Sequence, residues 1–212
     1  MEKSKYVQYG CGITAPADWI NYDASPTLRI QKTFLVGTIA RKYLNVIFPD
    51  NVKYGDIIKG LPEQDNSCDG VYCSHTLEHL ALDDFRKALR NTYKMMKPGG
   101  IFRCVVPDFA WAARSYVEAY DHNIATASLD FLNETLLGVR QRVRGIKGIL
   151  SNTIGNAHHL WMWDTKSLSM ELEDAGFRDI RACSFNDASD KMFELVEDAG
   201  RFLHAVAIEC KK

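Results

Sequence analysis

The sequence lacks any apolar run close to the ~20 residues that a membrane-spanning helix needs, and its first residues, MEKSKYVQYG, contain no signal-peptide core. We therefore expect no membrane span and a location in the cytoplasm. A strong charge of one sign is also absent, because the formal net charge is −1. The composition thus gives no reason to expect nucleic acid as a partner.

Metal-binding cysteine patterns are missing too. None of the six cysteines belongs to a C-x-x-C pair, and no Cys/His spacing fits a structural zinc site. Most of the cysteines lie in apolar, strand-like runs, where a free thiol behaves as a small hydrophobic group. We expect reduced thiols, and these patterns predict no metal ion.

What the sequence does contain is an ordinary globular composition, with 46% hydrophobic and 25% charged residues in a chain of 212. That length suits one domain, residues 1–212, better than two. Segments of β-forming residues alternate with segments of helical periodicity, which is typical of a parallel sheet. Strands are expected at residues 6–9, 19–22, 52–54, 69–73, 101–106, 178–185 and 203–210, and helices at 28–44, 82–96, 165–176 and, more briefly, 189–198.

Cap and turn residues delimit the clearest helices. Asp83 can cap the helix over 82–96, and the KPGG run that follows stops it in a type II turn, because proline cannot continue the helical hydrogen bonds. Asp164 or Thr165 opens the later helix, and Gly176 ends it.

We predict an α/β fold with a doubly wound, mostly parallel seven-stranded sheet. The last two strands are joined by little chain, so the C-terminal strand is expected to be antiparallel. Residues 13–18 are too few for the usual crossover between the first two strands, which needs a dozen or so residues, and the first crossover helix is therefore shortened. Residues 109–160 form a helical insertion after the fifth strand, which we expect to act as a lid on the substrate side.

Glycines and acidic residues fall at the ends of the first three strands. Gly10 and Gly12 follow the first strand, Asp23 ends the second, and Asp56 follows the third. Ligands bind at the carboxyl edge of such sheets, and glycines let a ligand approach backbone N–H groups closely. Asp23 can accept hydrogen bonds from both ribose hydroxyls, and Asp56 from an adenine amino group. The pattern predicts an adenosine site.

The length of the first crossover decides between two adenosine cofactors. Gly10, Gly12 and Ala15 satisfy the dinucleotide fingerprint, but that fingerprint needs a full helix after the glycines and an acidic residue ~20 residues further on. Asp23 follows Gly12 by only eleven residues. Without the helix, a pyrophosphate loses the N-terminus that normally binds it. S-adenosylmethionine has no phosphate, so the sequence favours this methyl donor over NAD.

Three longer runs carry a resemblance to a known family: YGCG…WINYDASP, YGDIIKGLPEQDNSCDGVYCSHTLEHL and KPGGIFRCVVPD. They resemble the class I, Rossmann-like methyltransferases of the type-11 branch, and most closely its small bacterial members that are associated with polysaccharide or sugar modification. The later run NAHHLWMWDTKSLSMELEDAGF is similar to a segment of those members. The resemblance implies a methyltransferase that uses S-adenosylmethionine as cofactor and acts on a small-molecule or glycan acceptor.

Carried over position by position, the resemblance also implies which residues contact the cofactor. The loop around its methionine part corresponds to residues 10–12, the ribose-binding acid to Asp23, and the adenine-contacting pair to Asp56 and Ile57. The segment after the fourth strand passes beneath the donor. The implied cofactor-binding residues are Gln8, Gly10, Cys11, Gly12, Asp23, Asp56, Ile57, Ser74 and His75.

Two positions depart from the family pattern. Gln8 stands where an acidic residue is usual; it can hydrogen-bond but supplies no negative charge to a sulfonium ligand. The third glycine of the loop is also missing. A non-catalytic S-adenosylmethionine-binding or regulatory protein that retains the fold is therefore the alternative to an enzyme. The missing first helix disfavours a dinucleotide-dependent oxidoreductase.

The leading hypothesis is methyl transfer to an oxygen of a sugar or another small hydroxylated metabolite. Such an acceptor benefits from a general base. The candidate catalytic residues are Asp108, just after the fifth strand, and His159 in the HHLWMWD run. His79 is a third, although a buried or capping histidine fits its place beside Glu78 equally well.

Two further groups are open to more than one interpretation. Trp161 and Trp163 either stack on a sugar ring or pack in the core. The basic residues clustered within 140–147 either bind a phosphate or form a solvated helix face; they are Arg140, Arg142, Arg144 and Lys147. The sequence leaves the acceptor atom and the oligomeric state open.

Overall fold

The computed structural model describes residues 4–33, 46–139 and 158–212. The basic cluster within 140–147 lies outside these ranges, as does most of the helix expected over 28–44. Within the described residues, no helix is both long and apolar enough to cross a membrane.

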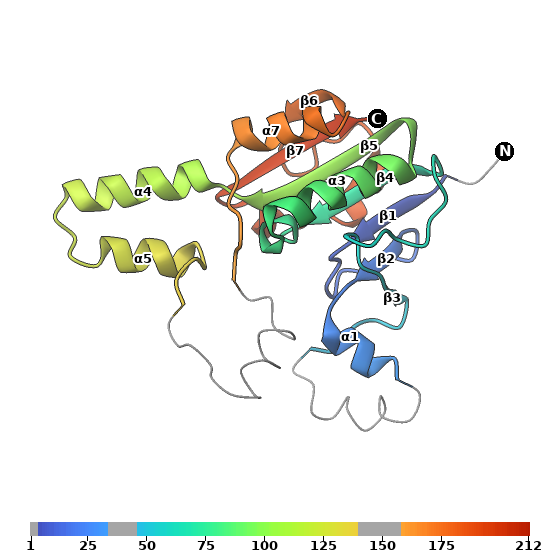
Figure 1. Cartoon of the computed structure of the whole chain (residues 1–212), viewed down its shortest axis with the longest axis horizontal. Helices are drawn as coiled ribbons and strands as arrows, with labels where there is room; N and C mark the ends of the chain where they lie inside the picture. The colour runs from blue at the N-terminus through green and yellow to red at the C-terminus, as the bar shows by residue number, and fades with distance from the viewer. Residues whose placement is uncertain (1–3, 34–45, 140–157) are drawn as a thin grey trace.

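Seven strands form one mixed sheet (Figure 1). They are β1 (Tyr6–Tyr9), β2 (Ile20–Asp23), β3 (Val52–Tyr54), β4 (Cys68–Ser74), β5 (Met96–Pro107), β6 (Arg178–Ala182) and β7 (Ala205–Lys211). Their spatial order is β3-β2-β1-β4-β5-β7-β6. The first five pair in parallel, whereas β7 runs antiparallel to both β5 and β6. The predicted mostly parallel sheet with an antiparallel C-terminal strand is confirmed.

Strand β5 departs most from the sequence-based expectation, because it begins at Met96 and so includes the KPGG run. Gly99 has a φ of +78°, the left-handed backbone that a type II turn requires at its third residue. The register between β4 and β5 also shifts between Cys68 and Gly70. The expected turn therefore forms within the strand, as a local irregularity of the sheet.

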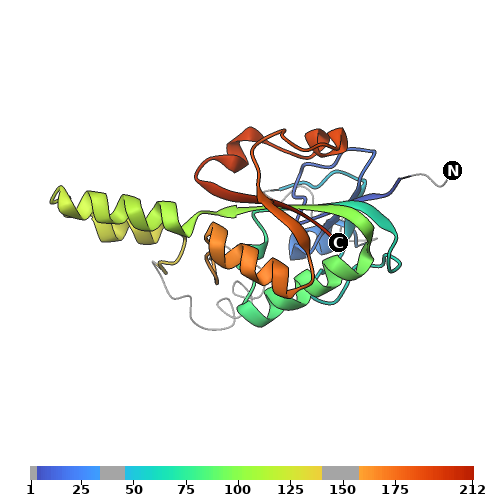
Figure 2. The same ribbon diagram turned by 90° about the horizontal axis from the view of Figure 1, so that it is seen from above.

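Helices and short 3-10 turns cover both faces of the sheet (Figure 2). They are α1 (Pro26–Gln31), η1 (Leu77–His79), α3 (Leu82–Met95), α4 (Phe109–Asp121), α5 (Ala127–Glu134), α7 (Thr165–Asp174), η2 (Lys191–Leu195) and η3 (Ala199–Phe202). α3 and α7 lie on one face, where Phe85 and Leu168 are fully buried in the main core. η2 and η3 lie on the opposite face, where Phe193 packs with Trp19 and Tyr72.

Side-chain capping explains where α7 begins, but not where α3 begins. α3 follows Ala81, and no described side chain caps it, so the cap predicted at Asp83 is wrong. Asp83 lies instead in the first turn, where a negative charge interacts favourably with the helix dipole. α7 begins with a capping box between Asp164 and Ser167. Gly176 follows its end with a φ of +106°, as the sequence predicts.

The crossover between β1 and β2 contains turns and no helix, which confirms the shortened first crossover. Gln8 supports this loop from β1. Its Nε2 donates to the carbonyl of Thr14 at 2.8 Å and to Oδ1 of Asn21 at 2.6 Å. The side chain that replaces the usual acid is therefore buried and joins the loop to β2.

Helices α4 and α5 form an arm that extends away from the sheet (Figure 1). α4 begins directly after β5, and α5 runs back beside it. The rings of Tyr116 and Phe131 pack between the two helices, with their centroids 5.7 Å apart. Two helices therefore follow the fifth strand within the first part of the predicted 109–160 insertion, whose residues 140–157 lie outside the described ranges.

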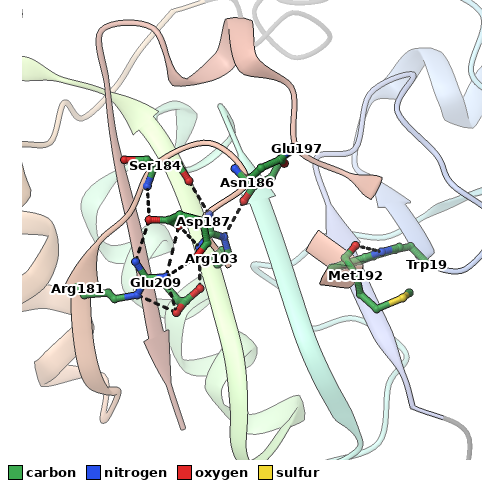
Figure 3. A network of polar contacts seen from close by, with 9 residues as sticks. All are labelled: Trp19, Arg103, Arg181, Ser184, Asn186, Asp187, Met192, Glu197 and Glu209. Carbon is green, nitrogen blue, oxygen red and sulfur yellow. Dashed lines mark hydrogen bonds and ion pairs between the residues drawn. The ribbon is translucent and has the colours of Figure 1, made fainter. Parts of the chain in front are cut away.

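A buried ion-pair network joins the segment between β6 and β7 to the sheet (Figure 3). Arg103 of β5 is fully buried and donates to Glu197 at 2.7 Å and to Glu209 at 2.6 Å. It also contacts Asp187 at 2.9 Å. Arg181 of β6 donates to Glu209 and Asp187 in turn. The segment fixed in this way leads to η3, whose Arg201 lines a pocket at the carboxyl edge of the sheet.

Candidate functional site

A pocket of about 570 Å³ opens where the parallel strands end, a size typical of small-molecule sites. It is lined by the turn after β1, the end of β2, the turn after β3, the segment after β4 and one residue of η3. The carboxyl ends of parallel strands meet at one edge, which brings these segments together. Six of the predicted cofactor residues line this pocket: Gly10, Gly12, Asp23, Asp56, Ile57 and His75.

The glycine turn makes room for a ligand at the end of β1. Gly10 and Gly12 have φ values of +66° and +55°, which favour glycine. A Cβ at Gly10 would collide with the side chain of Thr76. The amide of Cys11 donates to a carbonyl of β2 at 3.1 Å, and that of Gly12 to Oδ2 of Asp23 at 3.0 Å. Both amides already donate hydrogen bonds within the protein. Residues 11 and 12 therefore leave space for a ligand but supply no free amide hydrogen-bond donor.

Backbone amides orient the two carboxylates of the pocket. Oδ1 of Asp23 accepts from the amide of Ser25 at 2.7 Å. Oδ1 of Asp56 accepts from the amide of Ile58 at 3.0 Å, and its Oδ2 pairs with Lys59 at 3.1 Å. Each carboxylate oxygen can accept more than one hydrogen bond. Both side chains therefore keep acceptor capacity toward the pocket.

Three predicted cofactor residues lie behind the pocket wall: Gln8, Cys11 and Ser74 border a separate cavity of about 10 Å³, roughly the space of one water molecule. Burial, with a contribution from the negative charge of Asp23, raises the pKa of the Cys11 thiol to about 12. The thiol packs beside Leu28. Oγ of Ser74 has no hydrogen-bond partner among the described residues. These three side chains support the pocket from outside it.

Arg201 is a pocket residue that the sequence did not indicate, because no recognisable motif surrounds it. Its Nη1 donates to the carbonyl of Ser74 at 3.1 Å, and its own carbonyl lies 2.8 Å from Nε2 of His75. Burial opposes protonation of His75, but Glu78 and the Arg201 carbonyl outweigh it and raise the pKa of that ring. The two bonds hold η3 against the end of β4 and place a guanidinium in the pocket wall.

Beside the pocket, the fully buried Glu78 is surrounded by three histidines. Its Oε1 lies 3.5 Å from Nδ1 of His75, 3.9 Å from Nε2 of His79 and 4.0 Å from Nε2 of His159. Neither carboxylate oxygen has a hydrogen-bond partner among the described residues. The rings of His79 and His159 meet edge to face, 5.0 Å apart. Burial lowers the pKa of His159, although the charge of Glu78 opposes this.

The remaining predicted residues lie outside the pocket lining. Asp108 is the N-cap of α4 and accepts from the amide of Ala110 at 2.8 Å. Trp163 is 2% exposed and stacks on Phe85 with centroids 4.2 Å apart, so it is a core residue. Trp161 is 43% exposed and stays available to a ligand.

Residues 7–104 match a family model described as a methyltransferase domain. The matched segment runs from β1 into β5 and contains every residue that lines the pocket except Arg201. No curated protein sequence matches the chain.

Solved structures show the same fold. A SAM-dependent methyltransferase from Archaeoglobus fulgidus is 20% identical, with 99% of this chain and 86% of that chain covered and a TM-score of 0.51. One from Thermotoga maritima is 18% identical, with 100% and 84% covered and a TM-score of 0.51. The YcgJ protein of Bacillus subtilis is 12% identical, with 99% and 92% covered and the same TM-score, 0.51.

The fold is thus the Rossmann-like methyltransferase fold. Residues 7–104, just under half of the chain, are thus similar to a methyltransferase domain, and they lie within that fold. The pocket lining is compatible with an adenosine group, because its two carboxylates can accept hydrogen bonds from hydroxyl and amino groups. It is less suited to a pyrophosphate, because the described loop after the glycines contains no helix whose N-terminus could bind one.

Proposed function

We propose that this protein transfers the methyl group of S-adenosylmethionine to an oxygen of a sugar or another small hydroxylated metabolite. The acceptor oxygen forms a bond to the methyl carbon, the carbon–sulfur bond breaks, and S-adenosylhomocysteine leaves. The acceptor's proton passes to a base or to solvent. The observation that carries the proposal is the convergence of Asp23, Asp56 and the Gly10–Gly12 turn on one pocket.

On the donor side, each part of the cofactor has a suitable group. Asp23 accepts hydrogen bonds from the ribose hydroxyls, and Asp56 with Ile57 contacts the adenine. The methionine part occupies the space above the glycine turn. Arg201 binds its carboxylate, because the guanidinium is a cationic group in the lining of this pocket and suits a carboxylate geometrically.

On the acceptor side, the reaction needs groups that align the acceptor oxygen with the sulfonium. It also benefits from a group that accepts the proton of the acceptor hydroxyl or lowers the pKa of that hydroxyl. His159 is better placed than Asp108, the other candidate base, because its ring contacts His79, which lines the pocket. The Asp108 carboxylate is already used to cap α4.

We further propose that residues 1–212 act as one methyltransferase domain in the cytoplasm, with the 109–160 insertion covering the acceptor side as a lid. The chain that leaves the insertion supports this proposal. The amides of Leu160 and Trp161 donate to the carbonyl of Glu78 at 2.8 and 3.2 Å. The end of the insertion is thereby attached beside the pocket, with the half-exposed Trp161 ring next to it.

Calorimetric titration with S-adenosylhomocysteine tests the donor site. We expect one binding site per chain, and Arg201→Met should bind about 10-fold more weakly, which corresponds to one charge-assisted hydrogen bond. Arg201→Lys restores part of the affinity because the charge is kept. Arg90→Met, at an exposed position on α3, is the matched control. Absence of binding to the wild type at millimolar ligand would overturn the proposal.

A transfer assay with labelled S-adenosylmethionine and pooled sugar nucleotides separates an enzyme from a non-catalytic binding protein. Label should appear in the sugar fraction and depend on both substrates. Tight binding of the cofactor with no transfer to any hydroxylated acceptor favours the regulatory alternative.

A further inference from the structure

We propose that Glu78, His79 and His159 form a binding site for a divalent transition-metal ion beside the methyl-donor pocket. One carboxylate oxygen and two imidazole nitrogens from these residues all lie within 4.8 Å of one another. Glu78 and His79 belong to η1, whereas His159 comes from the segment that leads into α7. His159 is thus far from the other two ligands in the chain, and no short sequence motif indicates the site. The proposal revises the expectation of no metal that was drawn from the cysteine patterns.

The burial of Glu78 is the first argument for a cation. The residue is 0% exposed, and neither of its carboxylate oxygens has a hydrogen-bond partner among the described residues. A buried carboxylate without such partners is energetically unfavourable unless a cation compensates for it. His75, whose Nδ1 is 3.5 Å from Oε1, compensates only while its ring is protonated. A metal ion between this carboxylate and the two rings supplies that compensation.

The orientation of the two rings is the second argument. Nδ1 of His79 lies 3.0 Å from the carbonyl of His158. A carbonyl only accepts, so Nδ1 carries the proton and the lone pair of His79 is on Nε2, the nitrogen facing Glu78. This outer hydrogen bond is the usual way in which proteins orient a metal-binding histidine. Nε2 of His159 also faces Glu78, at 4.0 Å.

The distances between the ligand atoms are close to those in a site that holds a metal ion. A tetrahedral zinc site with bonds of about 2.1 Å places its ligand atoms about 3.4 Å apart. The two nitrogens are 3.9 and 4.0 Å from the Glu78 oxygen, so a movement of about 0.5 Å brings each into range. The main chains that carry the ligands are already joined, since the carbonyl of Glu78 accepts from the amides of Leu160 and Trp161.

The ligand types indicate which metals are suitable. Imidazole nitrogens favour zinc, copper, iron and nickel, whereas magnesium and calcium prefer sites made of oxygen. Three protein ligands leave a fourth position open, as in catalytic zinc sites. Since His79 lines the donor pocket, an oxygen of the acceptor can occupy this position. That role rests on the proposed function; the binding of the metal does not. In the metal-bound protein, Nε2 of His159 is a ligand and cannot also accept a proton.

Titration of untagged, metal-free protein with Zn²⁺, and separately with Co²⁺, tests the proposal. We expect one ion per chain by calorimetry and visible absorption of a four-coordinate Co²⁺ centre. Glu78→Gln and His159→Ala should each weaken binding more than 100-fold, because loss of a ligand exceeds the about 10–100-fold effect of losing an outer partner. His158→Ala is the matched control: it removes a neighbouring exposed histidine and keeps the carbonyl that orients His79.

Each outcome has a definite meaning. Stoichiometric Zn²⁺ binding that persists in His158→Ala and is lost in the two ligand variants supports the site. No stoichiometric binding by the wild type, or equal binding by the wild type and Glu78→Gln, overturns it. Binding of S-adenosylhomocysteine is measured on the same samples. A variant that still binds it is folded at the pocket, and a wild type that binds zinc but not S-adenosylhomocysteine contradicts the proposed function alone.

Discussion

At the scale of single residues, Asp23 serves both the fold and the proposed site. Its two carboxylate oxygens accept amide hydrogen bonds from Gly12 and Ser25, which join the turn after β1 to the start of α1. The same carboxylate lines the pocket. The side chain is thus held in one orientation before any ligand arrives, which lowers the entropic cost of binding.

The substitution Asp23→Asn tests this role. The amide can still accept with its oxygen but loses the negative charge, so the affinity for S-adenosylhomocysteine should fall by about 10-fold or more, which is the effect of one charge-assisted hydrogen bond. Calorimetric titration measures the change. Asp18→Asn, at an exposed position in the preceding loop, should bind as the wild type does. Equal affinities of the two variants would remove Asp23 from the site.

At the scale of elements, α7 shows how a short sequence motif determines where a helix begins. The Asp164 carboxylate accepts from the amide of Ser167 at 2.8 Å, and Oγ of Ser167 lies 3.2 Å from the amide nitrogen of Asp164. Two groups that the helix itself cannot satisfy are therefore paired. The apolar face then buries Leu168 and Leu172 completely.

Removal of this cap should destabilise the protein measurably. Asp164→Ala is expected to lower the free energy of unfolding by about 1 kcal/mol, a typical value for a lost N-cap. Urea unfolding followed by circular dichroism measures it. Lys166→Ala, at an exposed position in the first turn of the same helix, should change stability by less than about 0.5 kcal/mol. A similar loss in both variants would mean that helix propensity, and not the cap, sets the stability of α7.

At the scale of the whole molecule, the Arg103 network connects the sheet to the segment that carries η3 (Figure 3). The side chains of Arg103 and Glu197 are both completely buried. Replacement of such a pair by apolar residues is often tolerated, but removal of one partner leaves an uncompensated charge in the interior. The network therefore makes the position of the 184–202 segment, and with it that of Arg201, depend on one side chain of β5.

Arg103→Met should consequently lower the free energy of unfolding by about 3–5 kcal/mol. It should also weaken cofactor binding, because η3 loses part of its attachment. Chemical denaturation and calorimetry measure the two effects. Arg178→Met, which alters an exposed arginine at the start of β6, is the control and should lie within about 0.5 kcal/mol of the wild type. A stable Arg103→Met variant with unchanged binding would contradict this account.

The same network predicts how stability depends on acid. Burial opposes the ionisation of Asp187, but hydrogen bonds from Arg181, the Ser184 amide and Arg103 outweigh it and lower the pKa of Asp187 to about 2. A depressed pKa contributes stability that is complete above the unfolded pKa of about 3.9 and is lost as the pH falls towards 2. The stability difference between the wild type and Asp187→Asn should therefore shrink mainly between about pH 4 and about pH 2. Asp18→Asn is the control: the difference between its free energy of unfolding and that of the wild type should not change over the same pH range.

Much of the fold follows from the sequence because the signals are local. The alternation of strands and helices, the loop in place of the first crossover helix and the Gly176 stop each depend on a few neighbouring residues, and each is found as expected. The cap predicted at Asp83 was wrong because α3 begins at Leu82, before that residue. An acidic residue is favourable both as an N-cap and in the first turn, so the sequence does not distinguish the two positions. Strand β5 was placed too late because a turn inside a strand also contains proline and glycine.

By itself, the sequence determined the doubly wound sheet and six residues that line the pocket at its carboxyl edge. These depend on the ends of successive strands, which any parallel sheet brings to one edge. Only the tertiary structure decided that Gln8 hydrogen-bonds the loop behind the pocket, that Arg201 lines the pocket, and that Glu78 lies beside His159. These contacts join segments far apart in the chain. Their side chains meet through packing of the whole molecule, and no short-range pattern of residues encodes such a meeting.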